Sequence, residues 1–457
     1  MTTTLIIVLL AVAGYYLGWR RALAKSDGNI SSLHSLPGHY AWYVALLCAG
    51  PALAVWLVWL VFGDAMLRAI VVERLPGAVA GESAAMLDFF LSDVRRMAAG
   101  LSPNGEPNDA MIAAAELYRN LNGIGTIAFV MGSLALAAGG VAVGLSRVNP
   151  SFRARNHVEN WVAYTLLFAA GVSILTTAGI VFSVLFESIR FFDRVPVTDF
   201  LFGLEWSPQT ALRADQVAAE GSFGAVPLFA GTLMITFIAM LVAGPIGLLS
   251  AIYLSEYASP GFRATVKPIM EILAGVPTVV YGFFAALTVA PFVRQVGQEI
   301  GLQVSSESAL AAGAVMGIMI IPFVSSLSDD AINAVPRMLR DASLGLGATQ
   351  AETITKVIVP AALPGIIAGF LLAVSRAIGE TMIVVMAAGL AANLTANPLE
   401  AVTTVTVQIV TLLTGDQEFD SAKTLSAFAL GLVLFVSTLM LNVFALHILR
   451  TYREKYD

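Results

Sequence analysis

Long apolar runs separated by short polar segments limit the possible folds of this chain more than any other feature. A transmembrane helix needs about 20 mostly apolar residues to cross a hydrocarbon core of about 30 Å. Lipid offers no hydrogen-bond partner to backbone groups, so such runs are expected to form helices. The sequence therefore predicts an all-α polytopic membrane protein with spans at residues 4–19, 40–62, 123–145, 161–186, 225–255, 269–293, 309–328, 366–391 and 424–449.

Composition supports the membrane class and excludes several others. The chain is 58% hydrophobic and 12% charged, and the charged share is about half that of ordinary soluble domains. No basic block indicates a nucleic-acid partner, and a single cysteine, Cys48, excludes an intrachain disulfide. The four histidines are too scattered to indicate a metal site. No nucleophile, acid and base group together indicates an enzyme, so the chain is interpreted as a non-enzymatic membrane protein without a metal.

Basic residues orient the spans. The first run, residues 4–19, is followed by Arg20, Arg21 and Lys25, whereas a secretory signal carries its positive charges before the apolar stretch. We interpret this run, slightly short for a span, as an uncleaved anchor that begins outside. The cytoplasmic loops then hold 14 Lys and Arg in 93 residues and the external loops 10 in 145, as the positive-inside rule requires.

The polar segments divide the chain near residue 150. Residues 1–150 contain about three spans and a long external segment, 64–122, which is expected to form a small helical cap or helical hairpins on the membrane. Residues 151–457 contain six spans and a cytoplasmic loop at 329–365. Every feature that suggests a mechanism lies in this second part.

Arg376 and Glu380 are the only ionisable residues in the apolar run 366–391. A charge at bilayer depth costs at least about 2.5 kcal/mol, so it is retained mainly beside a polar path or a partner. If the helix enters the membrane at Ile366, Arg376 lies about 15 Å deep, near the midplane, where transporters hold their cargo. The planar guanidinium suits a tetrahedral oxyanion, and a Glu at i+4 would share its helix face and orient it. In the alternative interpretation, the two charges only neutralise each other against a neighbouring helix.

Gly275 and Pro277 lie inside the predicted span 269–293 and indicate a kink or a short unwound segment. Freed backbone groups, with the hydroxyls of Thr278 and Tyr281, would then line a substrate path. Helix packing is the alternative explanation for all four residues.

The cytoplasmic loop 329–365 contains the segment Asp341-Ala-Ser-Leu-Gly-Leu-Gly347, a polar helical stretch and then Pro360. Glycine permits close backbone approach and proline punctuates short helices, so the loop is expected to form a docking knob. It resembles the EAA loop of ABC importer permeases, in which an acidic residue and two small residues are followed by Gly at the seventh place and Pro at the twentieth. Asp341, Ala342, Gly347 and Pro360 occupy these places, whereas Asp341 replaces the usual Glu and Ser343 the usual Ala. The alternative is an ordinary amphipathic surface helix.

The chain contains no Walker phosphate-binding loop, because none of its five lysines follows a glycine. ATP and Mg are therefore expected on a separate ATPase subunit, which would push on the EAA-like loop.

Two segments resemble the permeases of the phosphate-specific ABC import system: residues 373–382, Ala-Val-Ser-Arg-Ala-Ile-Gly-Glu-Thr-Met, and residues 251–258. The Gly-Glu-Thr-Met form is similar to the C-type (PstC) permease, and residues 272–282 and 199–206 add to the resemblance, which covers about residues 190–450. It implies a type I ABC importer permease core of six helices, preceded here by about three extra transmembrane helices. The resemblance assigns no role to residues 1–150.

The same resemblance implies the partners and the location. These are a related A-type permease that completes a heterodimer, two ATPase subunits and an external phosphate-binding protein, in the bacterial inner membrane. ATP-driven alternating access would carry phosphate past Arg376 and Glu380. A permease of the same architecture for molybdate, sulfate or a phosphonate remains an alternative, because Arg recognises charge and shape. An ion-coupled secondary transporter or a channel is the alternative from a different class.

Overall fold

The computed structural model describes residues 2–26, 30–75, 84–103, 107–208, 221–414 and 420–452. The chain forms two compact units, Met1–Leu175 and Thr176–Asp457, whose boundary lies inside helix α6 (Ala154–Phe192). The domain division near residue 150 stays a prediction, and each compact unit is described by itself. Parts of the external segment 64–122 and of the C-terminal tail lie outside the described residues.

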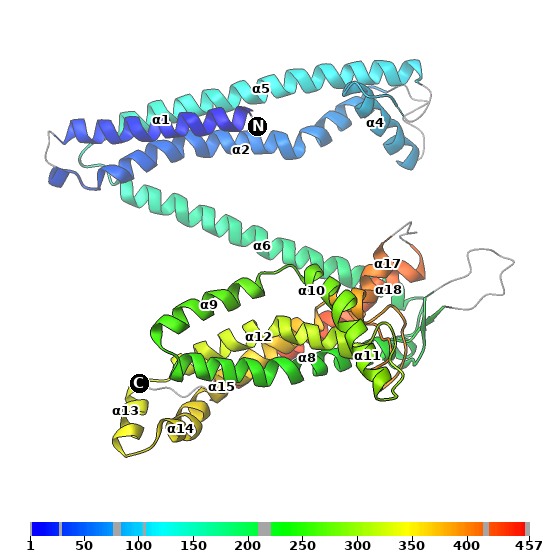
Figure 1. Cartoon of the computed structure of the whole chain (residues 1–457). Helices are drawn as coiled ribbons and strands as arrows, with labels where there is room; N and C mark the ends of the chain where they lie inside the picture. Colours follow the sequence, from blue (N-terminus) through cyan, green and yellow to red (C-terminus); the bar gives the residue numbers. More distant parts are fainter. Residues whose placement is uncertain are drawn as a thin grey trace. The chain divides into compact units, whose positions relative to one another are not determined.

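The N-terminal unit is built on three long helices that run side by side (Figure 1). At 1.5 Å per residue, the 37-residue α2 and the 39-residue α5 each exceed 50 Å, so both extend beyond a hydrocarbon core of about 30 Å. The short helix α4 packs against α5 through a small apolar core that includes Leu91 and Val94. The elements are α1 (Thr2–Lys25), η1 (Ile30–Ser32), α2 (Pro37–Glu73), α4 (Ala84–Ala98) and α5 (Asp109–Arg147).

Glycines allow the three long helices to approach closely. A Cβ on Gly140 of α5 would overlap the Leu47 carbonyl of α2, and one on Gly18 of α1 would lie 3.2 Å from the Tyr40 carbonyl oxygen of α2. Lipid is as apolar as the helices, so close van der Waals packing of small residues is a main source of helix association in membranes. These contacts hold the N-terminal bundle together.

Replacing Gly140 with Leu is expected to destabilise the N-terminal unit, because the side chain would force α5 away from α2. Overpacking of this kind typically costs about 1–3 kcal/mol, and a rigid backbone as the obstacle places the change at the upper end. The neighbouring Gly139 provides a matched control, since a Cβ there meets no atom within 4 Å. Thermal unfolding of the detergent-purified chain, followed by size exclusion, should show a lower midpoint for G140L than for G139L. Equal midpoints would contradict the packing argument.

The described residues of the second unit are also mainly helical, with one two-stranded antiparallel sheet. Its core lies between α8 and α12, where Ala239, Met316 and Ile320 are fully buried, and α15 packs beside them. The elements up to α11 are the C-terminal part of α6, α7 (Val197–Phe202), β1 (Trp206–Ser207), β2 (Ser222–Phe223), α8 (Val226–Ile252), the π-helix η2 (Tyr253–Tyr257), α9 (Pro260–Ala274), α10 (Thr278–Phe284), the π-helix η3 (Ala285–Val289) and α11 (Ala290–Glu299). The remaining elements are α12 (Ala309–Asn333), α13 (Arg337–Gly345), α14 (Gln350–Thr353), the π-helix η4 (Ile354–Ile358), α15 (Val359–Ile378), α16 (Met382–Ala387), α17 (Val405–Leu413) and α18 (Ala422–Tyr452).

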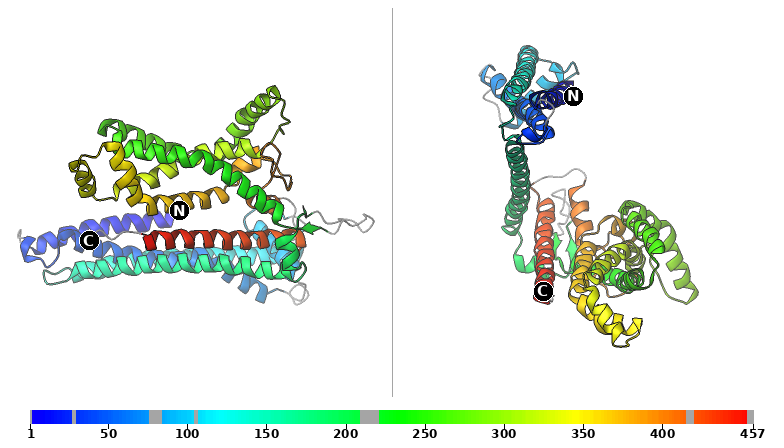
Figure 2. Two further views of the ribbon diagram at one scale, coloured as in Figure 1. Left: turned by 90° about the horizontal axis from the view of Figure 1, so that it is seen from below. Right: turned by 90° about the vertical axis from the view of Figure 1, so that its left-hand side faces the viewer.

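Elements far apart in the sequence meet at the two ends of this unit (Figure 2). The antiparallel hairpin pairs Trp206 with Phe223, and the Trp206 indole N–H donates a hydrogen bond of 3.1 Å to the Gln408 side chain on α17. Helices α13 and α14 lie at the opposite end from α11 and α17 (Figure 1). The hairpin and α17 thus form one end of the unit, and the knob predicted in the loop 329–365 lies at the other.

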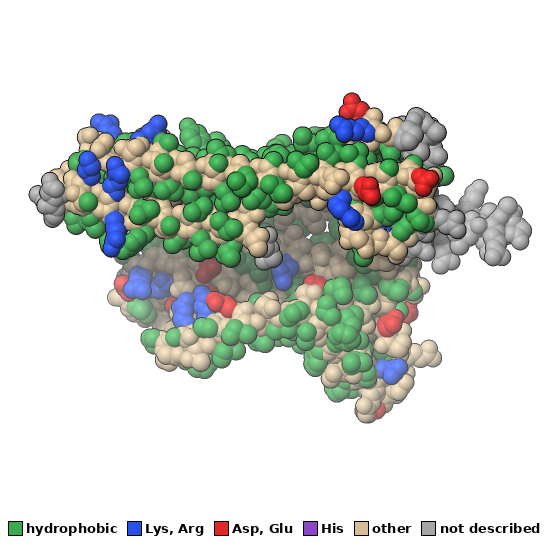
Figure 3. Space-filling view, turned by 90° about the horizontal axis from the view of Figure 1, so that it is seen from above, with side chains coloured by type: hydrophobic (Ala, Val, Ile, Leu, Met, Phe, Trp, Pro, Cys, Tyr) green, Lys and Arg blue, Asp and Glu red, His purple; other side chains and the backbone are tan. Residues whose placement is uncertain are grey.

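Within the described residues, nine helices are long and apolar enough to cross a membrane. The all-α polytopic prediction is confirmed. In the space-filling view of Figure 3, hydrophobic and uncharged side chains cover the middle of the visible helices, while Lys and Arg lie mainly toward their ends. Two predicted spans are displaced: 269–293 corresponds to Thr278–Glu299, and 366–391 corresponds to Gln350–Ile378. Both displacements arise where a glycine ends a helix inside an apolar run.

Candidate functional site

Two interrupted helices lie next to each other in the second unit. Helix α9 ends at Ala274 and α10 begins at Thr278, and in the same way α15 ends at Ile378 and α16 begins at Met382. The glycines that cap the first helix of each pair have nearly the same backbone angles, φ −84°, ψ −7° at Gly275 and φ −82°, ψ −5° at Gly379. The helices that follow the breaks, α10 and α16, pack against each other.

The first break has a clear local cause. Pro277 has no backbone N–H and occupies the N-cap of α10, so the helical ladder cannot continue through it. Across the break, the half-buried Tyr281 donates a hydrogen bond of 2.9 Å from its hydroxyl to the Leu273 carbonyl. Thr278 is the first residue of α10 and is also half-buried. The structure thus places the predicted break at Gly275 and Pro277 and uses the Tyr281 hydroxyl to fasten its two sides.

The second break corrects the predicted helix around Arg376 and Glu380. Because α15 ends at Ile378 and Gly379 is its C-cap, Glu380 is not on a continuous helix four residues after Arg376, and the predicted shared helix face is wrong. Glu380 Oε1 instead accepts a hydrogen bond of 3.2 Å from the Met382 backbone N–H. Among the described residues, no ion pair joins Arg376 to Glu380 or to another carboxylate.

Arg376 itself lies in the last turn of α15 with an exposed side chain. Its guanidinium carbon is 5.8 Å from the centroid of the Phe323 ring on α12, a cation–π contact that leaves its N–H groups free for another ligand. Among the described residues, no hydrogen bond or ion pair uses the donors of this side chain.

A threonine-rich segment lies beside the second break, and sequence reasoning missed it. The buried residues Thr403 and Thr404 precede α17, and the buried Thr406 lies in its first turn. The Thr406 hydroxyl donates a hydrogen bond of 2.9 Å to the Glu380 carbonyl, which ties α17 to the unwound segment after α15. The Thr-Thr-Val-Thr pattern was visible in the sequence, but its contact with residue 380 depends on the return of the chain.

The loop 329–365 forms a knob of two short helices, α13 and α14. Gly347 connects them in the left-handed region, at φ +88°, and Thr349 with Glu352 forms a capping box that starts α14. The Ser343 and Thr353 hydroxyls are 2.9 Å apart and join the two helices. Of the other predicted residues, Asp341, Ala342 and Pro360 are exposed.

The surface of this knob is unusually apolar for exposed helices. The Met338 side chain is 80% exposed and Leu346 is 90% exposed, and Leu344 lies between them in the sequence. A short helical hairpin with apolar residues at its tip suits a protein partner better than solvent.

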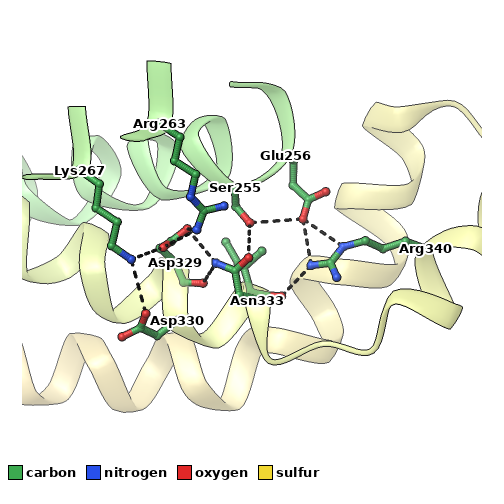
Figure 4. A network of polar contacts seen from close by, with 9 residues as sticks. Ser255, Glu256, Arg263, Lys267, Asp329, Asp330, Asn333 and Arg340 are labelled. Atoms are coloured by element: carbon green, nitrogen blue, oxygen red, sulfur yellow. Dashed lines mark hydrogen bonds and ion pairs between the residues drawn. The ribbon is translucent and has the colours of Figure 1, made fainter. Parts of the chain in front are cut away.

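A buried carboxylate that sequence reasoning did not single out anchors α9 (Figure 4). Asp329 of α12 has a side chain only 4% exposed, and it accepts two hydrogen bonds of 2.9 Å from Arg263 and one of 2.8 Å from Lys267. The hydrogen bond from Lys267 to Asp329 raises the pKa of Lys267. In the sequence, the Asp329-Asp330 pair directly after the apolar run 309–328 could have indicated such a site. The residues of α9 that bind Asp329 are, however, distant in the sequence.

A second ion pair lies next to the first and reaches the knob (Figure 4). Arg340 of α13 pairs with Glu256 of η2 at 3.0 Å and donates to the carbonyls of Ile332 and Val335 at 2.8 and 2.9 Å. Asn333 lies between the two ion-pair groups. Its amide N–H donates to Asp329, and its side-chain oxygen accepts from Ser255, whose hydroxyl also lies 3.5 Å from the Glu256 carboxylate. The knob is thus fastened to the end of α12.

A cavity of about 210 Å³ separates part of α9 from α12. It runs from Lys267 and Asp329 to Phe323, the residue under Arg376, and Ser325 and Ser326 of α12 add hydroxyls to its wall. The cavity therefore connects the ion pairs on α9 with the neighbourhood of the interrupted helices.

Comparisons with known proteins agree with this architecture. Residues 243–454 match the family described as binding-protein-dependent transport system inner membrane component, and residues 4–176 match a family described as phosphate ATP-binding cassette transporter. The probable ABC transporter permease protein YqgH of Bacillus subtilis is 32% identical over 277 residues, which cover 60% of this chain and 84% of that protein. The phosphate transport system permease protein PstC of Mesorhizobium japonicum is 31% identical over 265 residues, which cover 55% and 77%.

A crystal structure of a bacterial ABC transporter involved in the import of the acidic polysaccharide alginate aligns with a TM-score of 0.46 at 16% identity, covering 66% of this chain and 99% of that one. That likeness is too low to compare individual residues. The sequence relatives are transport permeases, and with nine apolar helices in the part of the chain that the structure describes, this is a multi-pass protein of the bacterial inner membrane. The chain belongs to the inner membrane components of binding-protein-dependent transport systems, as a PstC-like ABC importer permease with an additional N-terminal region.

Proposed function

We propose that this chain is a membrane permease of an ATP-driven phosphate importer and that Arg376 binds phosphate during its passage. The observation that carries the proposal is the position of Arg376, a cation without a carboxylate partner, at the end of an interrupted helix. The names of the relatives, PstC among them, support phosphate as the cargo. Glu380, Thr278 and Tyr281 belong to the same interrupted segments and would shape the path.

The chemistry follows from the guanidinium. Two parallel N–H donors fit two oxygens of a tetrahedral oxyanion, and the charge does not change at any physiological pH. A site with only positive charge would hold its anion too tightly to release it. Glu380 lies two residues beyond Ile378, the last helical residue of α15. Its carboxylate, on the adjoining segment, would weaken phosphate binding when that segment moves.

The exposed knob suggests where an ATPase subunit of the transporter would bind. An ATPase subunit would bind the exposed tip of α13 and α14, where Asp341, Ala342, Ser343 and Gly347 shape the hairpin. Pro360, in the first turn of α15, would end the coupling segment. A related A-type permease would complete the membrane channel, a second ATPase copy would bind that permease, and an external phosphate-binding protein would deliver the cargo. ATP-driven closure of the two ATPases would move the knob and change which side of the membrane reaches Arg376.

Competition between oxyanions tests the proposed cargo. Uptake of labelled phosphate into proteoliposomes that contain the assembled transporter and its binding protein should fall on addition of unlabelled phosphate. Molybdate, sulfate and a phosphonate at the same concentration should leave it within about twofold, because a site matched to one anion rejects others that leave its buried donors unpaired. If one of these anions reduced uptake more strongly than unlabelled phosphate does, that anion would be the cargo instead of phosphate.

A further inference from the structure

Helix α9 leads from the end of η2 to the first helix break. The buried carboxylate of Asp329 on α12 holds α9 in place. Arg263 and Lys267 lie four residues apart on one face of α9 and both bind Asp329. The Asp329 side chain is 4% exposed, whereas those of Arg263 and Lys267 are 29% and 33% exposed. The carboxylate is thus the fixed point and α9 is the element attached to it.

The knob is attached to the same end of α12, through the hydrogen bond of 2.8 Å from Arg340 to the Ile332 carbonyl, and also to η2. Glu256, whose side chain is 12% exposed, binds Arg340 of α13, and its backbone carbonyl accepts a hydrogen bond of 2.6 Å from the Gln350 side chain of α14. Ser255 links this group to Asn333, because its hydroxyl lies 3.5 Å from the Glu256 carboxylate and 3.4 Å from the Asn333 side-chain oxygen. Asn333 in turn donates hydrogen bonds of 2.7 and 2.9 Å to the Asp329 carbonyl and carboxylate. A continuous chain of polar contacts runs from both helices of the knob to α9 (Figure 4).

We propose that Asp329 is a positioning residue of the transport cycle: it holds α9 against α12 in the present state and transmits movement of the knob to the break at Gly275. This inference extends the proposed function, because it names the residues through which the ATPases act on the path. When the knob moves, Arg340 shifts the end of α12 through its hydrogen bond to the Ile332 carbonyl, and the hold of Asp329 on α9 loosens. Helix α9 then moves as a lever that ends at the interrupted segment.

Two features of the structure fit a contact that opens. An ion pair can separate and re-form without disrupting an apolar core. All side chains of α9 are at least partly exposed, so this helix has no buried apolar side chain to extract. The cavity of about 210 Å³ beside Lys267 shows that α9 and α12 are not packed together over this stretch. The Lys267 side chain also reaches Asp330, at 3.8 Å, which offers a second position for the released amine.

A cysteine probe measures this opening directly. Cys48 is replaced by Ala, and Ser325, which lines the cavity and is 3% exposed, is replaced by Cys. The rate of reaction with a membrane-impermeant maleimide is measured in inside-out vesicles that contain the assembled transporter. Lys267→Met should raise this rate at least about fivefold, the lower range of typical coupling between sites. Arg263 still compensates the Asp329 charge in this variant, so folding should be retained, as size exclusion of the extracted complex would verify.

Lys356→Met is the matched control, because Lys356 forms an exposed ion pair with Glu352 at 3.3 Å on the neighbouring η4. It should leave the labelling rate unchanged, and Lys267→Arg should preserve the slow rate. Lys267→Met should also lower the amount of phosphate carried per ATP hydrolysed. Equal labelling of S325C with and without Lys267→Met, or an equal increase with Lys356→Met, would overturn the proposal. The labelling requires neither phosphate nor Arg376, so it tests the role of Asp329 even if phosphate is not the cargo.

Discussion

Replacing Arg376 with Gln is expected to reduce phosphate uptake at least about 100-fold while the transporter still assembles. Each charge-assisted hydrogen bond is worth about 1.5–3 kcal/mol, and about 1.4 kcal/mol corresponds to a tenfold change, so two lost bonds account for this reduction. Gln keeps a polar side chain of moderate length but neither the charge nor the two parallel donors. The fold should tolerate the change, because Arg376 is exposed and, among the described residues, its guanidinium forms a cation–π contact with Phe323 but no ion pair.

Uptake of labelled phosphate into proteoliposomes measures the effect, and co-purification of the partner subunits measures assembly. Arg294→Gln is the matched control, since Arg294 is an exposed arginine on α11 outside the interrupted segments. It should keep nearly full uptake. If R376Q transports phosphate as well as R294Q does, Arg376 does not bind the cargo, and only the architecture of the permease remains.

The second large effect is expected at the knob, where Gly347→Leu should reduce ATP-dependent uptake about tenfold or more without loss of the membrane fold. Gly347 has φ +88°, a conformation that costs an L-residue about 1–2 kcal/mol, so the turn between α13 and α14 should change shape. A Cβ at this glycine meets no atom within 4 Å, so the effect comes from backbone conformation and from the altered tip. The altered turn would misplace the surface that the ATPase binds.

Gly345→Leu is a stringent control for this prediction. Gly345 lies at the end of α13 in the same knob, its Cβ position is equally open, and its φ is not positive. Uptake, ATP hydrolysis and recovery of the complex are measured for both variants. Selective loss of uptake in G347L supports docking at this turn, and unchanged uptake in G347L would place the ATPase contact elsewhere.

The sequence predicted the helical architecture well because lipid imposes a simple rule on apolar runs. It also located the first break, since Gly275 and Pro277 carry an explicit backbone constraint. The second break was missed because no proline lies between Ile378 and Met382, and Gly379 alone is a weak signal inside an apolar run. This single omission produced the incorrect helix face for Arg376 and Glu380.

The contacts of Asp329 could not be predicted for a different reason. Its partners Arg263 and Lys267 are 66 and 62 residues away in the sequence, so the pairing depends on how α9 returns along α12. A sequence without aligned relatives carries no record of such a contact. The threonines beside Glu380 illustrate the same limit, because Thr406 reaches residue 380 only after the chain has passed through α16.

The central claim is that Arg376 holds phosphate on its way through the membrane. An experimental density map of the assembled transporter, trapped with phosphate bound inside the membrane, tests it most directly. The account predicts phosphate within hydrogen-bond distance of the Arg376 guanidinium, beside the break between α15 and α16. Phosphate bound to other residues, with Arg376 still resting on the Phe323 ring, would contradict it.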